Sequence, residues 1–334
     1  YRLHLEALAR AGLEVGLLAA LQSRGERVHR PWWRGKLLHE TRHADRPVLL
    51  DHFWHLAPSR LKRSHRVELA ALRGVGRYIR RHGRPDLIHA HGTTGAGQVA
   101  RAAARRFGLS YVLTENMTTF ERGLIKPWLH RLNADVLDEA AMVLPLSPRL
   151  GRVLEAQYGA AATPWTVVPN MLDEALFDHA RPAVPSEGPF TFFNVGRFDP
   201  VKRHDWLVEA FARAFTDDDV VLKLGGDGPL RGEVEERVRA LGIDHKVEFL
   251  GNVPRTEVAR HMRASHAYAL SSSHETFAIP LIESLASGTP VVSTRCAGPD
   301  TIVNPDNGLL VDPEDLDGFA GALRAMRDRA AMYD

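Results

Sequence analysis

The chain has 334 residues, of which 44% are hydrophobic and 25% are charged, with 43 Lys and Arg against 41 Asp and Glu. This length exceeds what one hydrophobic core usually supports and predicts two domains, and the composition is typical of a soluble globular protein. Cys296 is the only cysteine, which excludes an intramolecular disulfide and a zinc site built on several thiolates, and favours a reducing, cytoplasmic location.

Basic residues concentrate in the first part of the chain. Residues 1–180 hold 26 Lys and Arg against 17 Asp and Glu, whereas residues 181–334 hold 17 against 24. One basic stretch contains the residues Arg30, Trp32, Trp33 and Arg34. Arginines beside tryptophans suit an anionic membrane surface or a lipid-linked acceptor, and a solvated basic face explains them equally well. Apolar runs fall short of the roughly 18 to 20 residues that span a bilayer, so we expect at most peripheral attachment to the inner face of the plasma membrane.

Short apolar runs alternate with helical periodicity along the chain, which predicts βαβ units and parallel sheets. The runs expected to form strands are 14–21, 86–91, 110–114, 141–146 and 165–169, then 190–196, 220–226, 246–251, 267–271 and 290–294. Residues 173–189, with three prolines and no apolar periodicity, predict a linker between domains 1–172 and 190–334. The expected fold is therefore α/β, with two doubly wound parallel-sheet domains whose ligands bind beyond the carboxyl ends of the strands.

Cations follow the strand expected at 190–196. In "GRFDPVKRHDWLVEAF", Gly196 permits a tight turn, Arg197 offers a planar fork of donors, and Lys202 lies at the opening of a helix. Cations combined with the N–H groups of a helix start form an anion site, for which a diphosphate is the obvious ligand. An exposed cationic turn is the alternative interpretation.

Glycines follow the next strand in "GGDGPLR". Arg231 stands where a dinucleotide fingerprint needs its third glycine, so the nicotinamide interpretation fails. Gly228 still lets a nucleotide approach the backbone closely, and Pro229 suits the start of the following helix.

Two glutamates flank a predicted helix start in "HETFAIPLIESLASG". Pro280 is tolerated only in a first helical turn, so the helix should begin near it and end before Gly288. Glu275 then precedes the helix and Glu283 lies in its opening turns. The N–H groups expected to be available to an anion are those of Phe277, Ala278, Ile279 and Leu281. Carboxylates beside a phosphate suit sugar and ribose hydroxyls, although a glutamate in a first helical turn is also common for reasons of the helix dipole.

These motifs, with "GPDTIV" and the N-terminal "PDLIHAHG", "YVLTEN" and "VVPNMLD", resemble in order and spacing glycosyltransferase family 4, retaining enzymes of the GT-B fold with an E-x7-E motif. The resemblance implies transfer of a sugar from a UDP- or GDP-linked donor to a glycan or lipid-linked acceptor in surface polysaccharide or glycoconjugate assembly, without a metal or other cofactor. It implies that Arg197 and Lys202 hold the diphosphate, Glu275 contacts the donor sugar, and Glu283 accepts hydrogen bonds from the ribose. The resemblance also implies that Asn116 lies near the donor sugar, at a position where the family often has histidine.

The resemblance also implies a first strand and a glycine-rich loop ahead of Tyr1, and we expect these to be missing from the sequence given. An epimerase or phosphorylase on the same fold remains an alternative, which would need a titratable acid or base at the site, and Asn116 weakens it. A basic protein that binds nucleic acid or anionic lipid is a second alternative, but it leaves the C-terminal motifs unexplained and no nucleic-acid partner is expected.

Overall fold

A computed structural model describes residues 7–23, 38–43, 46–56, 63–159, 164–177 and 188–333. The basic and aromatic cluster predicted at Arg30, Trp32, Trp33 and Arg34 lies outside these residues. The chain divides into two compact units. Unit 1 comprises residues 1–116, 125–145 and 154–166, and unit 2 comprises residues 117–124, 146–153 and 167–334.

The described residues of unit 1 form two three-stranded sheets, ordered β1-β3-β2 and β4-β5-β6. The strands are β1 (Gly16–Ser23), β2 (Leu38–His43), β3 (Arg46–Leu56), β4 (Leu87–His91), β5 (Ser110–Glu115) and β6 (Met142–Pro145). The helices are α2 (Arg63–His82), η1 (Thr93–Gly97), α3 (Gln98–Phe107), α4 (Pro127–Asp138) and α5 (Pro148–Tyr158), the last of which begins in unit 2 and ends in unit 1. Strands β4, β5 and β6 are parallel, as predicted, whereas β2 and β3 form an antiparallel pair that the sequence did not predict. The strand predicted at 165–169 is wrong, because only Trp165 pairs, in a single bridge to Val143.

Unit 2 is built on one six-stranded parallel sheet, ordered β12-β11-β10-β7-β8-β9. Its strands are β7 (Phe190–Val195), β8 (Val220–Gly225), β9 (Val247–Gly251), β10 (Ala267–Leu270), β11 (Val291–Thr294) and β12 (Gly308–Val311). The helices and helical turns are α6 (His204–Ala214), α7 (Arg231–Ala240), η2 (Asp244–Lys246), α8 (Arg255–Arg263), α9 (Ile279–Ala286), α10 (Pro299–Ile302), α11 (Leu316–Arg329) and η3 (Ala330–Met332). The five strands predicted here are confirmed, and β12 is an addition.

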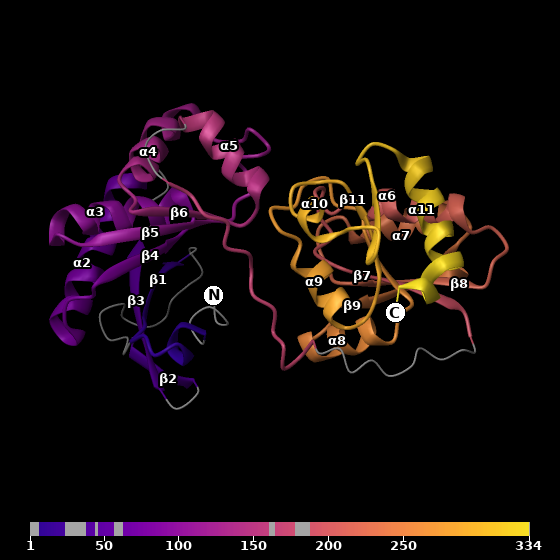
Figure 1. Cartoon of the computed structure of the whole chain (residues 1–334), viewed down its shortest axis with the longest axis horizontal. Helices are drawn as coiled ribbons and strands as arrows, with labels where there is room; N and C mark the ends of the chain where they lie inside the picture. Colours follow the sequence, from indigo (N-terminus) through magenta and orange to yellow (C-terminus); the bar gives the residue numbers. More distant parts are fainter. Residues whose placement is uncertain are drawn as a thin grey trace. The chain divides into compact units, whose positions relative to one another are not determined.

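Neighbouring residues of each strand face opposite sides of this sheet, so the core of unit 2 has two layers. Phe192 and Val292 pack with apolar residues of α6, α7 and α11 in one cluster. Their neighbours Phe193 and Val291 pack with residues of α8 and α9 in the other. In Figure 1, α6, α7 and α11 accordingly lie above the sheet of unit 2 and α8 below it.

The strand order of unit 2 places a topological switch point between β7 and β10. From β7 the chain moves outward to β8 and β9, then returns to β10 and moves outward the other way. This is the doubly wound order in which the loops after the two central strands diverge and leave a crevice at the carboxyl ends. In this structure, loops 196–203 and 271–278 follow these two central strands.

Candidate functional site

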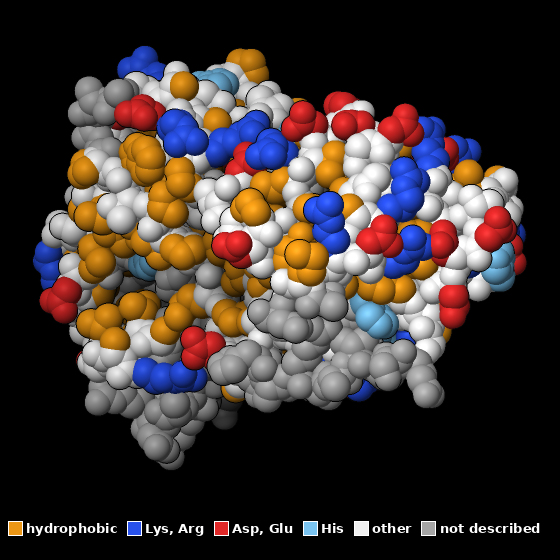
Figure 2. Space-filling model, turned by 45° about the vertical axis from the view of Figure 1, so that its right-hand side comes forward, with side chains coloured by type: hydrophobic (Ala, Val, Ile, Leu, Met, Phe, Trp, Pro, Cys, Tyr) orange, Lys and Arg blue, Asp and Glu red, His pale blue; other side chains and the backbone are white. Residues whose placement is uncertain are grey.

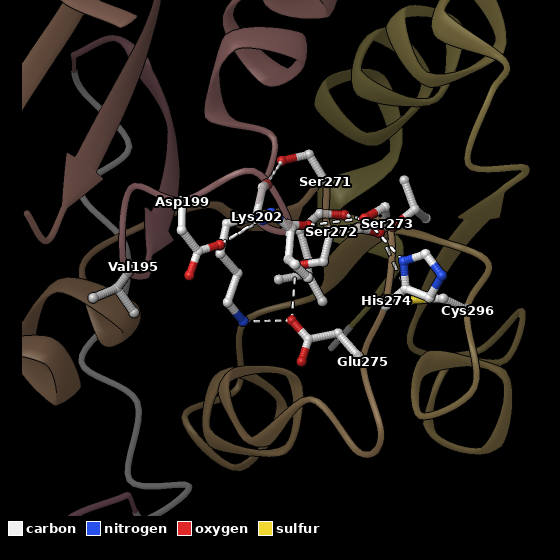
Figure 3. A network of polar contacts seen from close by, with 12 residues as sticks. Val195, Asp199, Lys202, Ser271, Ser272, Ser273, His274, Glu275 and Cys296 are labelled. Carbon is white, nitrogen blue, oxygen red and sulfur yellow. Dashed lines mark hydrogen bonds and ion pairs between the residues drawn. The ribbon is translucent and has the colours of Figure 1, made fainter. Parts of the chain in front are cut away.

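Lys202 and Glu275 meet at the switch point. Lys202 ends the loop after β7 and Glu275 lies in the loop after β10, and the Lys202 Nζ atom is 2.5 Å from the Glu275 Oε1 atom (Figure 3). Their side chains are 26% and 12% exposed, so the pair is mostly enclosed but reachable from solvent. The structure thus joins two residues that the sequence analysis assigned to one donor site from separate motifs.

Two serines fasten the loop after β10 to the loop after β7, and a third holds Glu275 (Figure 3). The hydroxyl of Ser271 donates to the carbonyl of Lys202 (2.8 Å), and the N–H of Ser273 donates to a carbonyl of the same loop (2.8 Å). Ser272 donates its hydroxyl to Glu275 Oε1 (2.7 Å). Sequence reasoning missed these serines, although their run before "HE" was a visible signal. They hold Lys202 and Glu275 in register without depending on a ligand.

The glycine-containing turn after β8 lies directly against the loop after β7. A Cβ atom at Gly228 would lie 2.5 Å from the carbonyl oxygen of Phe198, and one at Gly226 would lie 1.9 Å from that of Gly196. Gly226 also has a φ of +119°, which an L-residue rarely adopts. Backbone packing therefore requires these glycines whether or not a nucleotide also approaches them. Pro229 follows the turn and is exposed.

Arg197 extends into solvent from the loop after β7. Its side chain is exposed, and no hydrogen bond or ion pair joins its guanidinium to another described residue. A guanidinium in this state keeps all its donors for a ligand. Its predicted contact with a diphosphate stays a prediction.

Helix α9 begins next to Pro280, as predicted, and places Glu275 ahead of the helix and Glu283 inside it. The turn before it puts Ala278 in the left-handed region, with φ 69°. The N–H groups of Phe277, Ala278 and Ile279 make no backbone hydrogen bond with another described residue. Leu281 is a correction, because its N–H donates to the carbonyl of Ala278 (3.0 Å) and its side chain is fully buried in the core. The backbone N–H groups that remain without a backbone acceptor are thus those of residues 277–279.

Glu283 is a buried carboxylate with one strong partner. Its side chain is 4% exposed, and Arg255 donates from Nη2 to its Oε1 atom at 2.6 Å. Burial raises the pKa of Glu283 above its ordinary value, and the charge and hydrogen bond of Arg255 oppose that rise. The sequence analysis did not find Arg255.

The sequence analysis also missed one titratable carboxyl of unit 2, that of Glu121. Glu121 belongs to the segment 117–124 that groups with unit 2. Burial raises the pKa of Glu121 to about 7, with a smaller rise from the charge of Glu275 and an opposing effect of Arg149. Its Oε1 atom is buried and has no hydrogen-bond partner among the described residues. No motif surrounds Glu121 in the sequence, so nothing local could have identified it.

Unit 1 carries a buried carboxylate at the carboxyl end of β5. Glu115 is fully buried and accepts hydrogen bonds from the N–H and hydroxyl of Thr93 (2.7 and 2.6 Å) and from the N–H of Asn116 (2.8 Å). Glu115 therefore fixes the backbone of the turn after β4 and that of Asn116 itself. The predicted role of Asn116 toward a donor sugar stays a prediction.

Charges of both signs mix over the surface of unit 2. Figure 2 shows Lys and Arg side chains interspersed with those of Asp and Glu at the right of the view. The excess of acidic residues after position 180 thus forms no uniform acidic face there. Among the described residues, no group of three His, Cys, Asp or Glu side chains lies close enough to hold a metal ion.

Known families match both parts of the chain. The family described as "Glycosyl transferase 4-like domain" matches residues 3–171, and that described as "Glycosyl transferases group 1" matches residues 177–330. The chain belongs to glycosyltransferase family 4. D-inositol 3-phosphate glycosyltransferase from Acidothermus cellulolyticus is 31% identical over 276 residues, which cover 75% of this family 4 chain and 61% of that protein. The lipopolysaccharide core biosynthesis glycosyltransferase LpsE of Rhizobium meliloti is 37% identical over 147 residues, covering 44% of the chain and 42% of LpsE.

Solved structures confirm the predicted GT-B fold of this family 4 chain. Sucrose-phosphate synthase from Thermosynechococcus elongatus has a TM-score of 0.77 at 22% identity, covering 99% of the chain and 84% of that structure. Anabaena HepE, in complex with UDP, has a TM-score of 0.70 at 20% identity, covering 85% of the chain and 78% of that structure. The chain spans about three fifths, 61%, of the length of the first curated relatives it matches.

Proposed function

We propose that the protein is a retaining glycosyltransferase that moves a sugar from a nucleoside diphosphate sugar, UDP- or GDP-linked, to a glycan or lipid-linked acceptor in surface polysaccharide or glycoconjugate assembly. The observation that carries the proposal is the pairing of Lys202 with Glu275 at the switch point, beside the backbone N–H groups of residues 277–279. A cation and helix-start N–H groups suit a diphosphate, and a carboxylate that already accepts hydrogen bonds suits sugar hydroxyls. HepE, a structural neighbour, has been solved with UDP and with UDP-glucose.

Each polar group of unit 2 then has a role. Arg197 and Lys202 bind the diphosphate and stabilise the negative charge that develops on it as the bond to the sugar breaks. Glu275 accepts hydrogen bonds from the donor sugar, and Glu283 accepts them from the ribose. In this scheme the ion pair with Glu275 keeps Lys202 extended before the donor arrives. The leaving phosphate oxygen accepts the proton of the acceptor hydroxyl, so no further base is invoked.

Thermal unfolding with UDP, GDP, ADP and their sugar conjugates, with and without EDTA, tests the donor and the proposed independence of metal. A ligand that binds only the folded state stabilises it by about 2.7 kcal/mol at a hundredfold excess over Kd. We expect a shift with one base that persists in EDTA. No shift with any nucleotide would overturn the proposed donor site, and a shift abolished by EDTA would overturn metal independence. NMR of the product anomer then distinguishes retention from inversion.

The acceptor side of the proposal includes an anionic membrane surface. Arg73, Arg77, Arg80 and Arg81 are all exposed along α2, which adds a described basic stretch to the one predicted near Trp32. No helix of the described residues is long and apolar enough to cross a bilayer. We expect sedimentation with anionic vesicles at low salt and its loss at high salt. Absence of binding to such vesicles would favour an acceptor in solution.

A further inference from the structure

The Glu283 carboxylate has one oxygen occupied and one available. Oε1 accepts from Arg255 at 2.6 Å, and no hydrogen bond from a described residue reaches Oε2. A buried carboxylate without a cationic partner is costly, and hydrogen bonds that hold one of its oxygens also fix the direction of the other. The ion pair therefore does more than neutralise Glu283, because it also fixes the orientation of the acceptor oxygen.

Arg255 is itself held in place on its other side. Its guanidinium lies over the ring of Phe177, 5.1 Å from the ring centre, and Phe177 is fully buried in the core of unit 2. Arg255 also begins helix α8, whose residues Val258 and Met262 pack in the same apolar cluster as Leu281 of α9. A packed ring and a packed helix thus position a side chain that is still 56% exposed.

We propose that Arg255 is a positioning residue for recognition of the nucleotide ribose. It holds Oε1 of Glu283 so that Oε2 of the same carboxylate accepts hydrogen bonds from the ribose hydroxyls of the donor. This inference rests on the proposed nucleotide site and extends it, because it makes discrimination between ribose and a deoxygenated sugar depend on a residue that does not touch the nucleotide.

Two nucleotides that differ only in the ribose hydroxyls isolate this role. We would measure Kd by calorimetry for UDP and 2′,3′-dideoxy-UDP, or the matching GDP or ADP pair if thermal unfolding selects that base. Arg255→Met should weaken UDP binding about tenfold or more and leave dideoxy-UDP binding unchanged within about twofold. Arg255→Lys, which retains the charge and an apolar stem over Phe177, should give an intermediate ratio of the two Kd values.

Arg260→Met is the matched control. Arg260 lies on the same helix, is 57% exposed, and pairs with Glu257 at 2.7 Å, but Glu257 is itself 45% exposed. This variant should keep the wild-type Kd for both nucleotides. The contrast between the two arginines separates an effect through Glu283 from a general effect of removing a cation from α8.

The outcomes separate the inference from the proposed function. If wild-type protein binds none of UDP, GDP and ADP, the proposed donor site fails and the inference fails with it. A second outcome is that wild-type protein binds UDP, and Arg255→Met weakens the binding of UDP and of dideoxy-UDP equally or changes the binding of neither. The proposed role of Arg255 is then overturned, while the donor site stands. The same holds if wild-type protein binds UDP and dideoxy-UDP equally, because Glu283 then does not recognise the ribose.

Discussion

The Nζ atom of Lys202 lies 2.5 Å from the Oε1 atom of Glu275, across the point where the sheet of unit 2 reverses its strand order. The two residues are 73 positions apart in the chain and come from loops after neighbouring strands. Each satisfies the charge of the other in the absence of ligand. Ser272 also donates its hydroxyl to Glu275 (2.7 Å). Under the proposed function, a phosphate would bind Lys202 and a sugar hydroxyl would replace the lysine as the second donor to Glu275.

Substitution of Lys202 by Met should weaken UDP binding by about ten- to a hundredfold, because a charged hydrogen bond to phosphate contributes about 1.5–3 kcal/mol. Isothermal titration calorimetry measures the change. Lys223→Met is the matched control, since Lys223 pairs with Glu248 (3.4 Å) on β8 and β9 and that carboxylate is 54% exposed. Equal losses in the two variants would mean that general electrostatic attraction, and not a contact of Lys202, binds the nucleotide.

Substitutions of Arg203 test whether the backbone of the loop after β7 is strained. Arg203 has φ 53° and ψ 46°, and it donates to the carbonyl of Pro313 (2.6 Å) and stacks on Trp206 (4.6 Å). Arg203→Ala and Arg203→Gly both remove these contacts, but only glycine relieves the left-handed strain. We expect the glycine variant to be more stable than the alanine variant by about 1 kcal/mol in urea unfolding.

The same pair of substitutions at Arg237 should give the opposite order. Arg237 is an exposed residue inside α7 that pairs with Glu209. In a helix interior, alanine is more stable than glycine by about 1 kcal/mol. If glycine were also less stable than alanine at position 203, the loop would carry no strain that matters for stability.

Local chemistry accounts for the parts of the site that the sequence could predict. Pro280 determines where α9 begins, because proline fits only the first turn, and this places Glu275 and Glu283 on either side of the helix start. The position of Lys202 follows in the same way from a strand, a turn and a helix in sequence. These features depend on a few neighbouring residues, which a reader of the sequence can see together.

The missed features depend on tertiary packing. Arg255 reaches Glu283 only because α8 packs against α9, and the two residues are 28 positions apart with no shared motif. The N–H of Leu281 was expected to be free, but it donates a hydrogen bond to the carbonyl of Ala278 in the tight turn before α9. The antiparallel pair of β2 and β3 escaped prediction because its polar first strand has no clear apolar alternation.

Position 298 should not accommodate a side chain without displacing its neighbours. A Cβ atom there would lie 2.3 Å from the backbone of Phe277, directly ahead of α9. Gly298→Ala should lower the free energy of unfolding by about 1–3 kcal/mol and weaken UDP binding, because it displaces the N–H groups of residues 277–279. Urea unfolding and calorimetry measure the two effects.

Gly232→Ala provides the comparison for that substitution. Nothing lies within 4 Å of a Cβ at Gly232, which is inside α7. The free energy of unfolding of this variant should be about 0.5–1 kcal/mol higher than that of the wild type, because alanine is favoured over glycine in a helix. Its affinity for UDP should equal that of the wild type. Retention of stability and UDP affinity by Gly298→Ala would show that the contact between residues 298 and 277 does not position α9.

His204 should make the stability of unit 2 sensitive to acid. Its imidazole is 2% exposed, stacks on Phe198 with ring centres 4.0 Å apart, and has no hydrogen-bond partner for either nitrogen among the described residues. Burial, with a smaller effect of Lys202, lowers the pKa of His204 from 6.5 to about 4. The unfolded chain therefore binds a proton that the folded chain does not between these two values.

The contribution of neutral His204 to the free energy of unfolding should be fully present above pH 6.5. It should fall as the pH decreases toward 4, by up to about 3 kcal/mol. His204→Leu removes the ionisable group and fills the same apolar site, so its advantage over wild type should grow as the pH falls from 7.5 to 4.5 in urea unfolding. Leu207→Ala, a buried change on the same helix that cannot titrate, should lower stability equally at every pH. A constant difference between His204→Leu and wild type over this range would mean that the folded protein protonates His204 as readily as the unfolded chain does.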